Sequence, residues 1–159
     1  MVKDYGFMFR EDPILKEDAA WVSAMTKDVT EYLSTLNIPT KAPELLRVAY
    51  HSACSMQHGQ KVHDQPIELL KKTGNNILEI PDGHLCCGSA GTYNLMQKEL
   101  ATELLKRKCD NIKKVNPDII AAGNIGCITQ ISNGTDTPIV HTIELLDWFT
   151  GGNKPKGIS

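Results

Sequence analysis

The sequence lacks the long apolar runs from which membrane spans are built. No stretch of its 159 residues approaches the roughly 18 consecutive apolar residues that a transmembrane helix needs. The start of the chain, MVKDYGFMFREDP, also has no apolar segment behind a basic flank, which a secretory signal would require. We therefore expect a cytoplasmic protein with no membrane span.

The chain also lacks a strong excess of charge and the common catalytic motifs. Its 17 Lys and Arg residues nearly balance its 19 Asp and Glu residues, which leaves a formal net charge of −2. Without a basic excess, we expect no nucleic acid partner. A phosphate-binding loop, a Ser-His-Asp order and a zinc-protease motif are all missing. The sequence therefore gives poor support for independent catalysis.

The chain does contain cysteines, and their arrangement is informative. There are five, an odd number that fits poorly with a complete set of disulfides, and two of them are adjacent in the stretch LCCGSAGTY. In a cytoplasmic protein, clustered thiols are more often metal ligands or redox groups than disulfides. Their positions relative to the predicted strands therefore decide what they do.

Hydrophobic periodicity predicts helices that alternate with strands. Strands are expected at 46–50, 76–80, 118–122 and 138–141. Helices are expected at 18–36, at 55–72, at 95–115 and at 142–149, with Pro66 acting as a break in the second of these or as the first residue of a new turn. This alternation is typical of an α/β fold with an open, mostly parallel sheet of about four strands flanked by helices. We expect a single domain over residues 1–159, with a helical segment at 1–40, an α/β core at 46–150 and a loose tail at 151–159.

Cysteines follow three of the four predicted strands. These strand-end cysteines are Cys54, Cys86, Cys87 and Cys127. The carboxyl ends of parallel strands meet at one edge of a sheet, where ligands bind, so the fold itself would gather the four thiols. Four thiolates form a soft ligand set that suits an iron–sulfur cluster or zinc. We further expect the GSAG segment to open a helix whose N–H groups face thiolate or sulfide, and Gly88 to leave room for a cluster.

Other residues of reactive type receive a structural interpretation. Cys109 continues the apolar stripe of the 95–115 helix, so we interpret it as a buried core residue and the charges of that helix as a solvated face. Asn124 is expected to shape the loop before Cys127. The histidines are interpreted as surface or hydrogen-bonded residues, with the three nearest to the cysteines as the better candidates for metal binding: His51, His58 and His84, ahead of His63 and His141.

Several motifs together carry a family resemblance. VAYHSACSMQHGQKV, HLCCGSAGTYNLMQKELA, GNIGC and VHTIELLDW resemble the C-terminal cysteine-rich (CCG) domain of the iron–sulfur subunit of glycolate oxidase (glycolate dehydrogenase), a family related to the CCG-containing subunit of heterodisulfide reductase. The resemblance spans nearly the whole chain. It implies an electron-transfer, iron–sulfur-binding domain of a glycolate-oxidising complex, rather than a catalyst by itself.

The resemblance also implies partners. Flavin-binding subunits of the complex would deliver electrons, which would pass towards a quinone-type acceptor, and the complex would lie at the inner face of the membrane. Other domains of the iron–sulfur subunit would be needed too, because this chain has only one CCG unit and no ferredoxin-like cysteine runs. The chain therefore resembles a C-terminal fragment or a separately encoded piece.

The family pattern is one cysteine, a distant CCG and a distant C-x-x-C, and it maps onto the strand-end cysteines. The last position of the pattern holds Gln130 instead of cysteine. An amide is a poor iron ligand, so the cofactor stays open between an iron–sulfur cluster, of which a 4Fe–4S cubane is one type, a zinc ion and an empty site. A zinc-bound or metal-free scaffold that docks partner subunits is the alternative function, and thiol–disulfide chemistry at Cys86 and Cys87 is a third.

Overall fold

A parallel sheet of four strands organises the chain in a computed structural model that describes residues 2–40 and 44–158. The strands are β1 (Arg47–His51), β2 (Asn76–Leu78), β3 (Ile119–Ala122) and β4 (Ile139–His141), in the spatial order β2-β1-β3-β4. Each of the three neighbouring pairs is parallel. The predicted α/β fold with an open parallel sheet is therefore confirmed.

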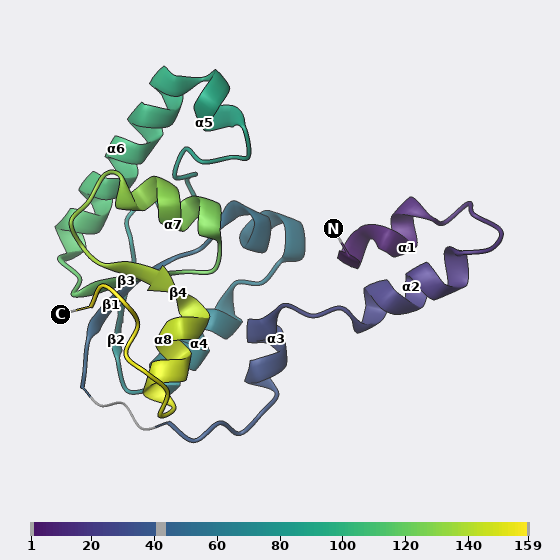
Figure 1. Cartoon of the computed structure of the whole chain (residues 1–159), viewed down its shortest axis with the longest axis horizontal. Coiled ribbons are helices and arrows are strands. Elements are labelled where there is room, and N and C mark those ends of the chain that lie inside the picture. Colours follow the sequence, from purple (N-terminus) through teal and green to yellow (C-terminus); the bar gives the residue numbers. More distant parts are fainter. Residues whose placement is uncertain (1, 41–43, 159) are drawn as a thin grey trace.

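Helices connect the strands and lie on both faces of the sheet (Figure 1). In chain order they are η1 (Val2–Asp4), α1 (Tyr5–Met8), α2 (Lys16–Met25), α3 (Val29–Ser34), the π-helical turn η2 (Ser55–Gln60), α4 (Asp64–Lys72), α5 (Tyr93–Met96), α6 (Lys98–Val115), α7 (Ile125–Ser132) and α8 (Thr142–Phe149). The predicted helix at 142–149 is confirmed, and α6 confirms most of the one at 95–115. Across the described ranges, no helix has both the length and the apolar character required to cross a bilayer.

The sheet separates two hydrophobic clusters because side chains alternate along each strand. Val48 and Tyr50 of β1 face α4 and α8, in a cluster that also contains Leu69, Leu70, Ile119, Ala121, Val140, Leu145, Leu146, Trp148 and Phe149. Ala49 faces the opposite side, which α6 and α7 cover, in a cluster with Ala53, Met56, Val62, Ile80, Cys87, Cys109, Ile112, Ile120, Cys127 and Ile131. The thiols therefore belong to the α6–α7 side of the sheet.

The single helix predicted at 18–36 was wrong, because the chain forms α2 and α3 instead. Thr26 has extended backbone angles (φ −69°, ψ 122°), which end α2. Asp28 then begins α3 with a capping box: its side chain accepts from the Thr30 N–H at 2.9 Å, and its own N–H donates to Glu31 at 2.7 Å. Apolar periodicity continues across this break and conceals it. Figure 1 shows α1 and α2 standing apart from the sheet, whereas α3 lies beside α4.

The helix predicted at 55–72 is also two elements, and its break is not at Pro66. Lys61 ends η2 in the left-handed conformation with φ 57°. The chain re-enters a helix at Asp64, so Pro66 is the third residue of α4. Proline is tolerated there because the first turn of a helix has no intrahelical partners for its N–H groups.

The described part of the C-terminal tail, residues 151–158, has no helix or strand but contacts the core. Pro155 is buried, and Ile158 packs against the α4–α8 cluster. The Lys154 ammonium lies 3.6 Å from a Glu44 carboxylate oxygen and 5.3 Å from the centre of the Trp148 ring. The tail therefore covers part of the face opposite the cysteines.

Candidate metal centre

The strand-end cysteines come from three loops at one edge of the sheet. Cys54 precedes η2 in the segment after β1, Cys86 and Cys87 lie in the loop after β2, and Cys127 lies in the first turn of α7 after β3. From β1 the chain continues to β2 at one edge of the sheet, and from β3 it continues to β4 at the other edge. The carboxyl ends of β1 and β3, where these two directions diverge, are the place where open α/β sheets bind ligands. All five cysteines of the chain are free thiols.

A compact group of donor atoms lies at the centre of this edge. The Sγ atoms of Cys87 and Cys127 and one ring nitrogen of His51 are all within 4.8 Å of one another, and all three residues are buried. Cys54 and Cys86 are partly exposed and lie close enough to this group for their charges to raise the pKa of Cys127. The structure therefore brings all four strand-end cysteines together, and it adds a histidine.

The thiols influence each other's protonation, as close thiols must. A hydrogen bond from the Cys127 thiol is the main effect that lowers the pKa of Cys87, and the nearby His51 ring adds to it, against the opposing effect of burial. The same bond between the thiols, together with burial, raises the pKa of Cys127. Burial raises the pKa of Cys54, and the charge of Cys86 adds to this. Thiols bind metal ions as thiolates, so a metal ion bound to Cys87 and Cys127 would release the protons that these thiols carry.

Backbone amides also face the sulfur atoms. The Gly88 N–H donates to Cys86 Sγ at 3.3 Å, and the Ser89 amide helps to lower the pKa of Cys87. The expected helix start at GSAG was wrong: residues 88–91 form turns before α5, with positive φ at Gly88, Ala90 and Gly91. The N–H groups therefore point at the sulfur from a turn rather than from a helix end.

Two residues near the cysteines have clear structural roles. Asn124 caps α7, and its side-chain oxygen accepts from the Cys127 N–H at 3.2 Å, so it shapes the loop as expected. Gly88 has φ 93°, and a Cβ there would lie 2.4 Å from the carbonyl oxygen of Ala101. A close neighbour that excludes a side chain at Gly88 is therefore the backbone of α6.

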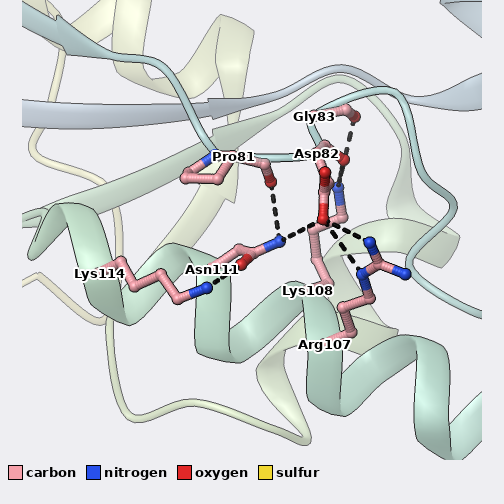
Figure 2. A network of polar contacts seen from close by, with 7 residues as sticks. All are labelled: Pro81, Asp82, Gly83, Arg107, Lys108, Asn111 and Lys114. Atoms are coloured by element: carbon pink, nitrogen blue, oxygen red, sulfur yellow. Dashed lines mark hydrogen bonds and ion pairs between the residues drawn. The ribbon is translucent and has the colours of Figure 1, made fainter.

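A buried lysine lies next to the cysteine loop, and the sequence reasoning did not identify it. Lys108 of α6 is only 2% exposed, and its ammonium donates to the carbonyl oxygens of Asp82 and Gly83 at 3.2 and 3.3 Å (Figure 2). Burial lowers the pKa of Lys108, whereas negative charge on the nearby cysteines, Cys87 first among them, raises it. The interpretation of the α6 charges as a solvated face was therefore wrong for Lys108, although its spacing from Ala101 and Ile112 places it on the apolar stripe.

The same helix holds the loop before the cysteine pair through side chains. Figure 2 shows Asn111 donating to the Pro81 carbonyl at 2.9 Å and to the Asp82 carboxylate at 3.3 Å. Arg107 donates to the same carboxylate at 2.7 Å, and this contact holds the pKa of Asp82 below its usual value. These bonds fix residues 81–83 on α6 immediately before the loop enters Cys86.

Replacing Lys108 with methionine is expected to destabilise the metal-free protein by about 1–2 kcal/mol. Two carbonyl oxygens would lose their donor, and this cost exceeds the relief from no longer burying an ammonium. Urea unfolding measures the difference. Lys106→Met, an exposed change on the same helix, is the matched control and should stay within about 0.5 kcal/mol of wild type. Equal effects of the two changes would contradict a structural role for the Lys108 contacts.

The remaining candidate residues differ clearly in how far they are buried. Cys109 is 3% exposed within the α6–α7 cluster, as expected for a core residue. His58, His63 and His84 are exposed, whereas His51 is 1% exposed and makes no hydrogen bond within the described residues. His51 is therefore a buried residue and not a surface one. Gln130 accepts a hydrogen bond from Asn94 at 3.2 Å.

The chain is similar in sequence to several known proteins. The model of the CCG family, described as "Cysteine-rich domain", matches residues 48–132. The chain is 34% identical over 147 residues to the glycolate oxidase iron-sulfur subunit of Escherichia coli (strain K12), covering 92% of this chain and 36% of that protein. It is 28% identical over 160 residues to lactate utilization protein A of Oceanobacillus iheyensis, covering 96% of this chain and 66% of the relative.

A further lactate utilization protein A, from Geobacillus thermodenitrificans, is 27% identical over 155 residues, covering 92% of this chain and 65% of that protein. The chain thus spans about a third of the length of the first of these relatives and about two thirds of the other two. The matched region of the family model begins in β1 and ends with α7, so it contains all four strand-end cysteines.

Proposed function

Because this chain belongs to the CCG cysteine-rich domain family, we propose that it binds an iron–sulfur cluster and transfers electrons through it. The ligands in this proposal are the strand-end cysteines. The observation that carries it is the convergence of four free thiols, from three separate loops, on one edge of the sheet.

The surroundings of the thiols fit a negatively charged, sulfur-rich cofactor. Thiolates are the usual ligands of iron–sulfur clusters, which supply one-electron redox chemistry when bound. The Gly88 N–H donates to a cysteine sulfur, and the Lys108 ammonium is buried on the adjacent helix. Such donors and charges stabilise thiolate and favour the reduced, more negative state of a bound cluster. The burial of Cys87 and Cys127 keeps water away from the sulfur atoms.

The names of the relatives suggest the pathway of the electrons. One relative is an iron-sulfur subunit of glycolate oxidase, and others are lactate utilization proteins. We therefore propose that this chain serves the oxidation of a 2-hydroxy acid such as glycolate or lactate, at the cytoplasmic side of the membrane. Flavin-binding subunits would oxidise the acid and deliver electrons, and a quinone-type acceptor would take them up. Further iron–sulfur domains would complete the path, because the chain spans only part of each relative.

A second candidate function is a zinc-bound scaffold that docks partner subunits. The observation that favours it is the short distance, within 4.8 Å, between the donor atoms of His51, Cys87 and Cys127. Tetrahedral zinc with Zn–S and Zn–N bonds of about 2.0–2.3 Å holds its donors roughly 3.5–3.8 Å apart. A single ion therefore fits this group if the donor atoms move closer together by up to about 1 Å.

Optical spectroscopy of anaerobically purified protein tests the electron-transfer proposal. After reconstitution with ferrous iron and sulfide, the protein should absorb in the visible range through thiolate-to-iron charge transfer. The absorption should bleach on addition of dithionite and return on reoxidation, because the cluster accepts and releases electrons. A colourless protein after reconstitution would contradict the proposal and would favour the zinc scaffold.

A further inference from the structure

We propose that His51 is a metal ligand and binds, through a ring nitrogen, the same metal centre as Cys87 and Cys127. The inference rests on the proposed function only in requiring a metal at this site, and it holds for an iron–sulfur cluster or for zinc. Its basis is the position, the burial and the missing hydrogen bonds of one imidazole ring.

The position of His51 in the sheet directs it to the thiols. It is the last residue of β1, and it pairs with Ala122, the last residue of β3. Strand side chains alternate, so His51 shares its face of the sheet with Ala49, on the α6–α7 side. Cys87 and Cys127 belong to the same side, and their sulfur atoms lie within 4.8 Å of the ring nitrogen.

The ring is buried without the partners that a buried imidazole normally has. His51 is 1% exposed, and neither Nδ1 nor Nε2 forms a hydrogen bond within the described part of the chain. A neutral imidazole carries one donor and one acceptor nitrogen, and leaving both unpaired in the interior costs free energy. A metal ion bound to the acceptor nitrogen removes that nitrogen's share of the cost, which makes ligation a physical explanation for a polar ring at this place.

Within residues 2–40 and 44–158, the other histidines do not offer the same arrangement. His58, His63 and His84 are exposed, and His141 uses Nδ1 to accept the N–H of Ile143 at the start of α8. The pairing of imidazole with thiolate is chemically ordinary, because zinc and iron both accept nitrogen and sulfur ligands. An imidazole in place of a thiolate makes the ligand set less negative, and in iron–sulfur centres this raises the reduction potential.

X-ray absorption of zinc-loaded protein tests the ligand directly. Full-length apoprotein is prepared anaerobically and loaded with one equivalent of zinc. The wild type should show sulfur scatterers together with the outer-shell scattering of one imidazole. His51→Ala should lose the imidazole signal and bind zinc at least about 100-fold more weakly, because even outer-shell partners of metal ligands contribute 10- to 100-fold to affinity. Wild-type protein that binds zinc with sulfur scatterers only, or that binds neither zinc nor a cluster, would overturn the proposal.

Two further variants separate ligation from folding. His84→Ala changes an exposed histidine near the cysteine loop and should leave both the imidazole signal and the affinity unchanged. His51→Cys should restore zinc binding with sulfur scatterers alone, because a thiol can replace the ring as a ligand. Failure of His51→Cys to bind zinc while its circular dichroism matches that of wild type would also overturn the proposal.

A second sample distinguishes failure of the inference about His51 from failure of the proposed electron-transfer function. A second portion of wild-type apoprotein receives ferrous iron and sulfide, and pulsed electron paramagnetic resonance of the reduced sample should detect nitrogen coupling that His51→Ala lacks. Imidazole ligation of zinc without uptake of iron and sulfide would support His51 as a ligand and contradict the electron-transfer function. A reconstituted cluster without nitrogen coupling would support that function and overturn the role of His51.

Discussion

Replacing Cys87 with serine should lower the iron and labile-sulfide content of the reconstituted protein about tenfold or more relative to wild type. Cys87 lies at the centre of the donor group, within 4.8 Å of Cys127 and His51, and its charge also affects the protonation of Cys54. A serine hydroxyl is a hard, weakly acidic ligand and does not replace a thiolate on iron. Iron and sulfide are measured on desalted protein after anaerobic reconstitution.

Cys109→Ala provides the matched control for this loss. Cys109 is also a buried thiol of the α6–α7 cluster, but it lies in α6 and is 3% exposed within the core. Its replacement should cost about 1 kcal/mol of stability through lost packing and should leave the iron and sulfide content unchanged. Retention of full iron and sulfide by Cys87→Ser would show that the strand-end cysteines do not hold the cluster.

Replacing Gly88 with alanine should destabilise the metal-free protein by about 3 kcal/mol or more. The backbone at Gly88 has φ 93°, a conformation that L residues rarely adopt, and the new Cβ would lie 2.4 Å from the carbonyl oxygen of Ala101. Relief of this overlap requires the cysteine loop to move away from α6. Thermal unfolding in the presence of a chelator should show a midpoint lower by roughly 6–12 °C.

Gly91→Ala separates the clash from backbone strain. Gly91 also has positive φ, at 62°, but a Cβ there would meet nothing within 4 Å. The change should therefore cost only about 1 kcal/mol, the strain of an L residue in the left-handed conformation. If both variants lost the same stability, contact with α6 would not be what requires glycine at position 88.

The strands were predictable because apolar runs and turn residues mark them in the sequence. Each predicted strand matches an observed strand to within two residues at each end. The helices between the strands predicted that the strands run parallel to one another. The convergence of Cys54 and Cys127 was predictable for the same reason, because strand ends of a parallel sheet share an edge. The periodicity of apolar residues was therefore enough to predict the fold class and the edge of the sheet at which the thiols lie.

Contacts between distant segments were not predictable in the same way. The break between α2 and α3 depends on the capping box of Asp28, which the continuing apolar spacing conceals. Lys108 is buried because two loop carbonyls from a different segment accept its protons, although its place on the apolar stripe was visible. The burial of His51 could have been inferred from strand alternation, since it shares a face with Ala49.

The metal and sulfide content of the anaerobically purified wild-type protein tests the central claim most directly. We predict iron and acid-labile sulfide in equal amounts, about four of each per chain for a cubane cluster, with little zinc. Elemental analysis and a sulfide assay on the same sample give these values. One zinc per chain without labile sulfide, or no bound metal, would contradict the proposal that the strand-end cysteines hold an iron–sulfur cluster.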